Sequence, residues 1–445
     1  MIKNIAAILL VFLTTGMQEG YAQEVWSLEK CIHHAFDNNI SIKRQELNTS
    51  IQKSELQQSK LNRLPSMSVE SSLGYSFGYT WIQELGTNVN VDIQSMNIGV
   101  GASVNVFNGF NQNNTIKRNN ANLLAAVSQT EKLRNDIALQ ITGHYLQILF
   151  DKELLAVAQE QYDVTMQQVE RTNKLVESGS QAKGSYLEIR SQAAKEALNV
   201  TMQQNSLALS LLNLAQLLDL EDVDGFDVVL PEIPGVEAIS LDRPGSVYKA
   251  AVDIMPQIKG ANHLLESSNY DVEIAKSGYY PSLSLNGSWG SRASWFLDDP
   301  EDVNRSFSDQ IESNKNSYIG ATLRIPVFNK FQTRNNVKSA RVRVMDAQYS
   351  LEQQKLDLRK EIQQAYADAM AAYNKYLSSN EAVESYKESF RYTEQKFSVG
   401  LVNSVDYNVA KTDYIRAQSD LLQSKYEYIL RNKILDFYKG VPIKL

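Results

Sequence analysis

The stretch that decides the fold is Ile98-Gly99-Val100-Gly101-Ala102-Ser103-Val104-Asn105-Val106-Phe107-Asn108, and it recurs in altered form 221 residues later as Ile319-Gly320-Ala321-Thr322-Leu323-Arg324-Ile325-Pro326-Val327-Phe328-Asn329. The same shift pairs Tyr145 with Tyr366, Gly179 with Gly400, and Tyr186 with Tyr407. Upstream the shift is 216 and pairs Ala35 with Ala251 and Pro65-Ser66 with Pro281-Ser282. An internal repeat of this kind predicts one structural unit used twice, which is typical of a pseudo-symmetric wall rather than of an enzyme with one cleft.

Composition and leader sequence restrict the class of protein. The 445 residues carry 44 basic and 51 acidic side chains without a basic stripe, so we expect no nucleic-acid partner. Cys31 is the only cysteine, which excludes a disulfide within the chain.

Residues 1–22 resemble a secretory signal peptide with cleavage after Ala22, because a short apolar run follows Lys3; a buried N-terminal helix is the less favoured alternative. No later run of about 18 apolar residues occurs. An exported chain of this type is periplasmic, secreted or an outer-membrane β-barrel.

Four segments alternate between apolar and small or polar residues: 65–80, 96–106, 283–295 and 319–327. Strands of about ten residues with this alternation and with aromatic residues toward one end are typical of a membrane barrel. A soluble β-sandwich with one buried face is the alternative. Because four strands cannot close a barrel and open edges are unsatisfied in lipid, we expect three copies to supply twelve strands. Two copies would leave almost no lumen.

Long proline-free helices are predicted over 111–176 and 332–397. Apolar positions repeat every seven residues, as in Ile148, Leu155 and Tyr162, which indicates coiled-coil packing. The chain reverses at Gly179 and at Gly400, since glycine tolerates the left-handed conformation at the end of a helix. Asn403 is predicted to cap the next helix, with Asp406 in its first turn.

The predicted organisation follows the repeat. We expect a signal peptide (1–22), a helix of the first repeat (23–64), a first barrel hairpin (65–108), a first long α-helical hairpin (109–218), a linker or equatorial segment (219–244), a helix of the second repeat (245–279), a second barrel hairpin (280–329), a second long α-helical hairpin (330–436) and a C-terminal equatorial tail (437–445).

Taken in order and in duplicate, several motifs resemble the TolC family of bacterial outer-membrane efflux and secretion ducts. They are 35–40 with 251–256, 64–66 with 280–282, 104–107 with 325–328, and above all 397–406, Phe-Ser-Val-Gly-Leu-Val-Asn-Ser-Val-Asp. The resemblance covers nearly the whole mature chain. It implies an α+β membrane protein in the outer membrane: a homotrimer whose twelve-stranded β-barrel, four strands per chain, continues into a long α-helical coiled-coil barrel in the periplasm. Residues 219–244 and 437–445 would form the equatorial collar.

The resemblance also implies functional residues and partners. Gly179, Ser180, Gly400 and Leu401 would lie at tunnel tips that contact a periplasmic adaptor, the membrane fusion protein, which couples to an inner-membrane pump of RND or ABC type. Asp406 matches the first of two acidic residues that narrow the tunnel mouth in this family, but Val409 replaces the second and Val402 stands where some members carry a basic latch residue. Asp406 has a structural interpretation as well, as a first-turn acid that stabilises the helix N-terminus.

No catalytic, cofactor or metal site is expected. The histidines lack partners at the spacing of metal ligands. The acidic loop 297–315 lacks the spacing of a calcium loop, so a solvated surface loop is the favoured interpretation.

The preferred hypothesis is a non-enzymatic exit duct that passes drugs and toxic small molecules. A type I protein secretion duct is the alternative, and an outer-membrane-anchored adhesive or structural coiled coil is a more distant one.

Overall fold

The computed structural model describes residues 25–82, 86–221, 223–231, 242–298 and 304–445. The expected signal peptide therefore lies outside the described residues. The chain divides into two compact units. Unit 1 comprises residues 1–45, 130–256 and 355–445, and unit 2 comprises 46–129 and 257–354.

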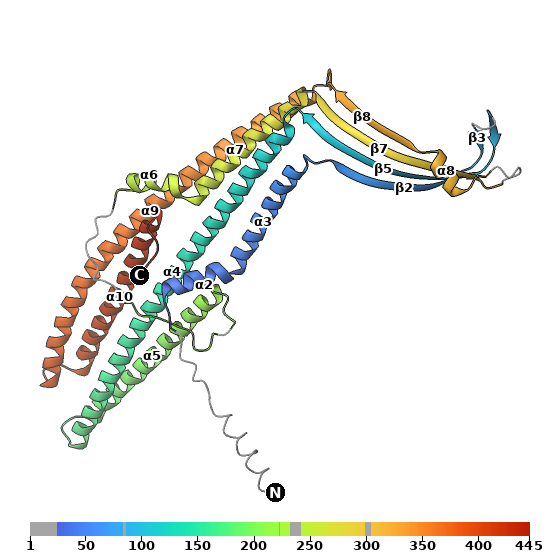
Figure 1. Cartoon of the computed structure of the whole chain (residues 1–445). Helices are drawn as coiled ribbons and strands as arrows, with labels where there is room; N and C mark the ends of the chain where they lie inside the picture. Colours follow the sequence, from blue (N-terminus) through green and yellow to red (C-terminus); the bar gives the residue numbers. More distant parts are fainter. Residues whose placement is uncertain (1–24, 83–85, 222, 232–241, 299–303) are drawn as a thin grey trace, which may run out of the picture. The chain divides into compact units, whose positions relative to one another are not determined.

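Two long helical hairpins are the main feature of unit 1 (Figure 1), and the first part of the long helix in each hairpin, before residue 130 or residue 355, belongs to unit 2. The first hairpin is α4 (Asn111–Glu177) followed by α5 (Lys183–Leu217), and the second is α9 (Gln332–Ser398) followed by α10 (Ser404–Tyr438). Both α4 and α9 have 67 residues, both α5 and α10 have 35, and all four boundaries differ by the repeat shift. The predicted repeat and the two predicted long helices are confirmed.

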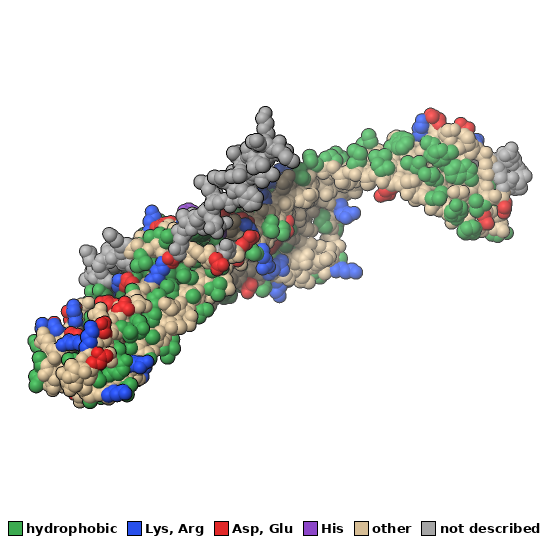
Figure 2. All heavy atoms as spheres, turned by 90° about the horizontal axis from the view of Figure 1, so that it is seen from below, with side chains coloured by type: hydrophobic (Ala, Val, Ile, Leu, Met, Phe, Trp, Pro, Cys, Tyr) green, Lys and Arg blue, Asp and Glu red, His purple; other side chains and the backbone are tan. Residues whose placement is uncertain are grey.

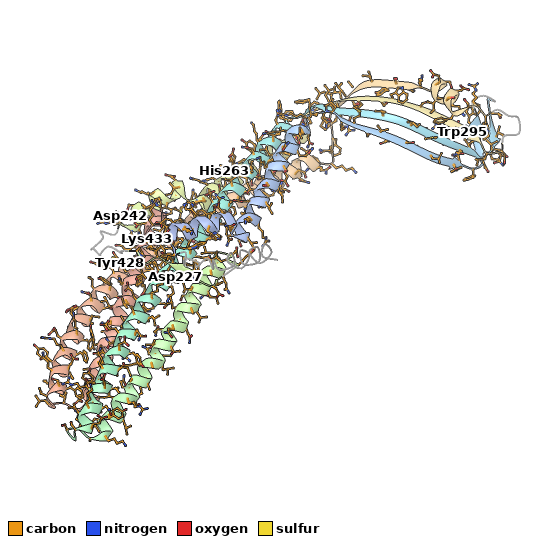
Figure 3. All side chains as sticks on the ribbon, turned by 60° about the horizontal axis from the view of Figure 1, so that its bottom comes forward. Asp227, Asp242, His263, Trp295, Tyr428 and Lys433 are labelled. Atoms are coloured by element: carbon orange, nitrogen blue, oxygen red, sulfur yellow. The ribbon has the colours of Figure 1, made fainter. Side chains whose placement is uncertain are left out.

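Shorter elements complete unit 1. They are β1 (Val25–Trp26), α2 (Leu28–Asn38), the first turns of α3 (Ile40–Leu61), β6 (Asp227–Val228) and α6 (Pro244–Ile254). Strands β1 and β6 pair in parallel and are held on α4. The Lys152 ammonium lies 2.5 Å from the carboxylate of Asp227, which Figure 3 labels, and the Tyr145 hydroxyl lies 2.8 Å from the Val229 carbonyl.

The core of unit 1 lies where α4 passes the short elements. Ile141, Ile148 and Leu149 of α4 have no exposed surface, and they pack with Cys31 of α2 and Leu214 of α5 in one apolar cluster. Cys31 therefore acts as a small apolar side chain, and burial raises its pKa to about 12. A thiol in this environment stays protonated and unreactive.

A four-stranded antiparallel sheet in the order β2-β5-β7-β8 is the main feature of unit 2. The strands are β2 (Ser66–Ser76), β5 (Ile93–Asn108), β7 (Ser282–Phe296) and β8 (Asn316–Arg324). Each repeat contributes two strands, and the central pair, β5 with β7, joins the two repeats. Helix α7 (Pro256–Lys276) and the 3₁₀ turn η1 (Ser277–Tyr279) lead into β7.

The register confirms that the sheet has one apolar and one polar face. Val69, Val100 and Trp289 lie opposite one another in one row, whereas Ser72, Asn97 and Arg292 form a hydrogen-bonded polar row that faces the other way. The apolar residues stay exposed, with Met67, Val69 and Ile319 at 74%, 72% and 92% of their full surface. Figure 2 shows hydrophobic side chains gathered over the sheet. The outer edges of β2 and β8 carry no strand partner among the described residues.

Three expectations about the strands were wrong in detail. The segment 65–80 is not one strand, because Gly78 has a φ of 107° and separates β2 from a small hairpin of β3 (Tyr79–Ile82) and β4 (Thr87–Asn90). Ile325 and Val327 lie beyond the end of β8. Strand β5 is longer than predicted at both ends.

The loop 297–315 is partly folded rather than simply solvated. Ser306 caps α8 (Phe307–Ser313), and the buried Gln310 side chain accepts a 2.7 Å hydrogen bond from the Ser294 amide of β7. The Phe307 ring stacks on Trp295, which Figure 3 labels. Residues 299–303, which hold most of the loop's acidic run, lie outside the described residues.

Candidate functional site: the tips of the helical hairpins

The two hairpins of unit 1 reverse through the same backbone motif. Gly179 has a φ of 75° and Gly400 a φ of 76°, in the left-handed region that glycine occupies without strain. The amide of Ser180 donates to the Leu175 carbonyl, and the amide of Leu401 donates to the Lys396 carbonyl. Each of these hydrogen bonds joins the first and last of six consecutive residues at the end of its helix. This is the Schellman arrangement, so both predicted turns are confirmed in conformation.

The reversals are exposed and partly apolar. Nothing lies within 4 Å of the position that a Cβ atom would occupy on Gly179 or Gly400. Val399 and Leu401 keep 69% and 74% of their surface exposed. Both open glycines leave the backbone of their turn accessible to another protein. Exposed aliphatic side chains flank Gly400, whereas serines flank Gly179.

Asp406 has the local role that its sequence context predicts. The Asn403 side chain accepts a 2.9 Å hydrogen bond from the Asp406 amide, so Asn403 is the N-cap of α10 and Asp406 lies in the first turn. The carboxylate is exposed. It therefore stabilises the positive end of the helix dipole and remains free to meet other charges.

The two hairpins contact each other just behind the tips. The Ser404 hydroxyl of α10 donates to the Glu188 carboxylate of α5. Beside this contact lies a groove of about 520 Å³ between the two helices, lined on α10 by Val405, Val409 and Thr412. Val409 contributes an apolar side chain to this groove, whose lining also includes the acidic residues Glu188 and Asp413.

A buried ion pair lies deeper in the same bundle, and the sequence had not predicted it. Lys411 of α10 is 2% exposed, and its ammonium lies 3.1 Å from the Glu196 carboxylate of α5. The hydroxyl of Thr165 on α4 contacts both groups, and the Gln161 carbonyl lies 3.3 Å from the ammonium. Burial lowers the pKa of Lys411, although the nearby carboxylate of Glu196 opposes this effect. A lysine on the buried stripe that also carries Tyr407 and Tyr414 was the available sequence signal.

Aromatic side chains fill the interface of the second hairpin next to this pair. The Tyr407 ring stacks on Phe397 at 4.7 Å, and the Phe390 ring stacks on Tyr414 at 5.9 Å. Burial raises the pKa of Tyr407 to about 12. The tyrosines at heptad spacing are thus packing residues here, as predicted.

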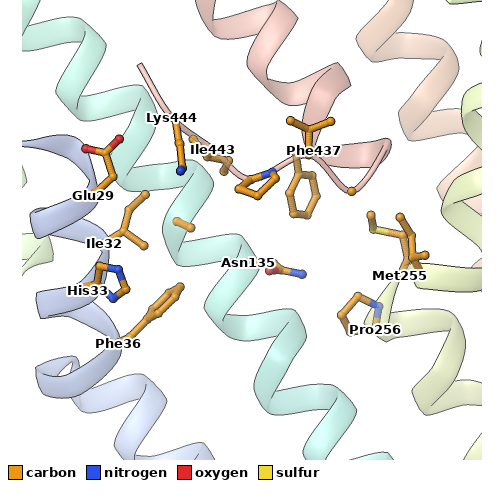
Figure 4. A pocket seen from close by; sticks show the side chains of 15 residues that line it. Glu29, Ile32, His33, Phe36, Asn135, Met255, Pro256, Phe437, Ile443 and Lys444 are labelled. Atoms are coloured by element: carbon orange, nitrogen blue, oxygen red, sulfur yellow. The ribbon is translucent and has the colours of Figure 1, made fainter. Parts of the chain in front are cut away.

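A pocket of about 430 Å³ lies elsewhere in unit 1, between α2, α4 and the C-terminal residues (Figure 4). Its lining is mostly apolar, including Ile32, Phe36 and Phe437, with Glu29 and Lys444 as the charged side chains. No nucleophile–base pair converges on it. Among the described residues no group of three or more potential metal ligands occurs, and no helix is long and apolar enough to cross a membrane.

Two long helices are each followed by a returning helix, and each is preceded by two strands of a shared sheet. This duplicated arrangement defines a two-repeat channel protein. The chain belongs to the family described as Outer membrane efflux protein, whose model matches residues 31–219 and 247–440. This confirms the resemblance noted in the sequence. It is a protein of the bacterial outer membrane.

Individual relatives agree with this assignment. The chain is 24% identical over 334 residues to the solvent efflux pump outer membrane protein SrpC of Pseudomonas putida, over 70% of this chain and 64% of the relative. It is 22% identical to the alkaline protease secretion protein AprF of Pseudomonas aeruginosa, over 52% of this chain and 50% of the relative. The matches thus span less than two thirds of these curated relatives. The fold is similar to the crystal structure of the Campylobacter jejuni CmeC outer membrane channel, with a TM-score of 0.76 at 17% identity over 93% of this chain and 85% of that one.

Proposed function

We propose that this protein is the outer-membrane exit duct of a tripartite efflux system, and that it passes small toxic molecules outward. The observation that carries the proposal is the duplicated hairpin with an open reversal at each end. Both turns leave their backbone open, and the second also exposes the aliphatic side chains of Val399 and Leu401, as a docking surface for a periplasmic adaptor requires. The adaptor would couple the duct to an inner-membrane pump.

The proposal includes a homotrimer. The unpaired edges of β2 and β8 would join between copies, because open strand edges are unstable in lipid. Three copies would give a ring of twelve strands, with the polar rows lining the lumen. The segment 219–244, of which residues 222 and 232–241 lie outside the described residues, and the tail 437–445 would form the equatorial collar of this assembly.

Crosslinking from a tip tests the adaptor contact directly. A photo-reactive residue at Leu401 is expected to capture a periplasmic adaptor in living cells, whereas the same residue at Leu198, exposed in the middle of α5, is expected not to. Labelling of Leu401 from outside the cell, or capture of a surface protein only, would contradict the duct and favour the adhesive coiled coil.

Conductance of the reconstituted protein tests Asp406. Three copies would place a ring of carboxylates at the tunnel mouth, which favours cations. We expect Asp406→Asn to raise the anion share of the current and to lower the melting temperature only slightly, because a first-turn carboxylate contributes about 0.3–1 kcal/mol. A lower melting temperature with unchanged selectivity would leave Asp406 only its role at the helix N-terminus.

Type I protein secretion remains the second candidate, because the relative AprF is named for secretion of an alkaline protease. The identity of the pump captured with the adaptor distinguishes the two. Deleting the gene should sensitise cells to solvents or drugs if the duct serves efflux, and should abolish release of a protein substrate if it serves secretion.

A further inference from the structure

A basic groove lies in unit 2 where α7 ends and α9 begins. It has a volume of about 450 Å³. Four basic side chains and two tyrosines line it: Lys276, Tyr279, Tyr280, Arg334, Lys338 and Arg341. We call this site the basic groove.

The positive charge of the basic groove is only partly neutralised. Lys276 lies 2.6 Å from the Glu273 carboxylate on its own helix, and Glu273 also borders the adjoining hollow. Within the described residues no ion pair joins Arg334, Lys338 or Arg341 to a carboxylate. Residues 324–345 contain six basic side chains and no acidic one. Such a surface attracts an anion.

The basic groove is continuous with the apolar face of the sheet. Phe107 pairs with Leu283 in that face, its ring lies 5.3 Å from Phe110, and Phe110 lies 6.4 Å from the Tyr280 ring that lines the groove. On α9, the Arg334 guanidinium lies 6.0 Å from the ring of Phe331. Aromatic side chains of this kind mark the boundary between lipid and water.

The neighbouring aliphatic and aromatic surface is unusually open. Val327 is 93% exposed, Phe328 72% and Phe331 59%. A free inorganic anion would gain nothing from this surface. A molecule with a phosphate and hydrocarbon chains would contact both the cations and the apolar side chains.

The repeat shows that the fold does not require the two arginines of the basic groove. The counterparts of Arg334, Lys338 and Arg341 are Asn113, Lys117 and Asn120. One unit therefore builds the junction without these two arginines, so Arg334 and Arg341 serve something other than folding.

We propose that the basic groove binds the headgroup phosphate of an anionic phospholipid, whose acyl chains lie against the exposed apolar side chains beside it. Arginine fits this role because its planar guanidinium binds phosphate oxygens through two parallel hydrogen bonds. Clusters of basic residues next to a membrane bind anionic lipid by this attraction. The site would fix the depth and rotation of the protein at the membrane surface.

Native mass spectrometry of the full-length, detergent-solubilised protein tests the site. The probes are dioctanoyl phosphatidylglycerol, dioctanoyl phosphatidylcholine and inorganic phosphate. The test variant is R334Q/R341Q. The matched control is K60Q/K117Q, which removes the same charge from the first repeat. Removing two groove cations is expected to weaken phosphatidylglycerol binding roughly thirtyfold. The control is expected to change binding less than about twofold, and R334K/R341K is expected to retain most of it.

Three results would overturn the proposal. Equal losses in the test and control variants would mean that diffuse charge, not the groove, binds the lipid. Equal binding of the two lipids by the wild-type protein would exclude recognition of an anion. Displacement of phosphatidylglycerol by equimolar inorganic phosphate would assign the groove to a free anion. Unchanged oligomer mass and circular dichroism of the variants exclude misfolding as the cause of a loss.

Discussion

The buried pair of Lys411 and Glu196 makes a strong prediction about local stability. Lys411→Met removes the ammonium but leaves the Glu196 carboxylate buried, with a 3.1 Å hydrogen bond from the Gln192 amide and the hydroxyl of Thr165 as its remaining partners. Removing one member of a buried pair costs about 3–5 kcal/mol, because the other charge is left uncompensated. We expect a loss of this size in the free energy that holds α10 against α4 and α5.

Amide hydrogen exchange measures this free energy in the intact protein. A loss of about 3 kcal/mol corresponds to exchange faster by about a hundredfold or more in the amides of α10 around Lys411. The matched control is Lys375→Met, which breaks a 3.0 Å pair with Glu427 between α9 and α10 whose side chains are 45% and 38% exposed. An exposed pair contributes about 0–1 kcal/mol, so the control should change exchange less than about fivefold.

The double variant K411M/E196Q decides the cause. Once no charge is buried, exchange should return to within about tenfold of the wild-type rate, because an apolar and a neutral side chain replace the pair. If Lys411→Met behaves like Lys375→Met, or if the double variant is as unstable as the single one, uncompensated burial of Glu196 is not the reason and the argument fails.

Other predictions concern the turn, the core and the pH dependence of unit 1. Gly400→Ala should lower the free energy of unfolding by about 1–2 kcal/mol, because an alanine in the left-handed region is strained, whereas Gly184→Ala inside α5 should be neutral or stabilising. Leu149→Ala should cost about 2–5 kcal/mol, since the side chain has no exposed surface; thermal unfolding followed by circular dichroism measures all three. Burial raises the pKa of Tyr407 from 10.0 to about 12, so its contribution is fully present below pH 10 and lost as pH rises through 12. Tyr407→Phe should therefore lose less stability than the wild type between pH 10 and 12, and equal losses would contradict this assignment.

The sequence by itself determined the long helices, their turns and the two faces of the sheet, all of which depend on local periodicity, although the ends of the strands were predicted less well. The seven-residue spacing and the absence of proline gave the bounds of α4 and α9 to within one residue, because a long helix needs only neighbouring residues to agree. Gly179, Gly400 and the cap at Asn403 were found for the same reason: each satisfies its own backbone within a few residues. Alternation in the strands fixed which side chains share a face, since a strand has a period of two.

Only the tertiary structure decided which distant side chains meet. Nothing near Lys411 in the chain indicates that Glu196 and Thr165 lie beside it, since they belong to three different helices. The folded loop 304–315 was missed because Gln310 is stabilised by β7 rather than by its sequence neighbours. The basic groove combines the end of α7 with the first turns of α9. Charges that are far apart in sequence acquire their effect when packing excludes water between them or gathers them on one surface, and no local pattern contains that information.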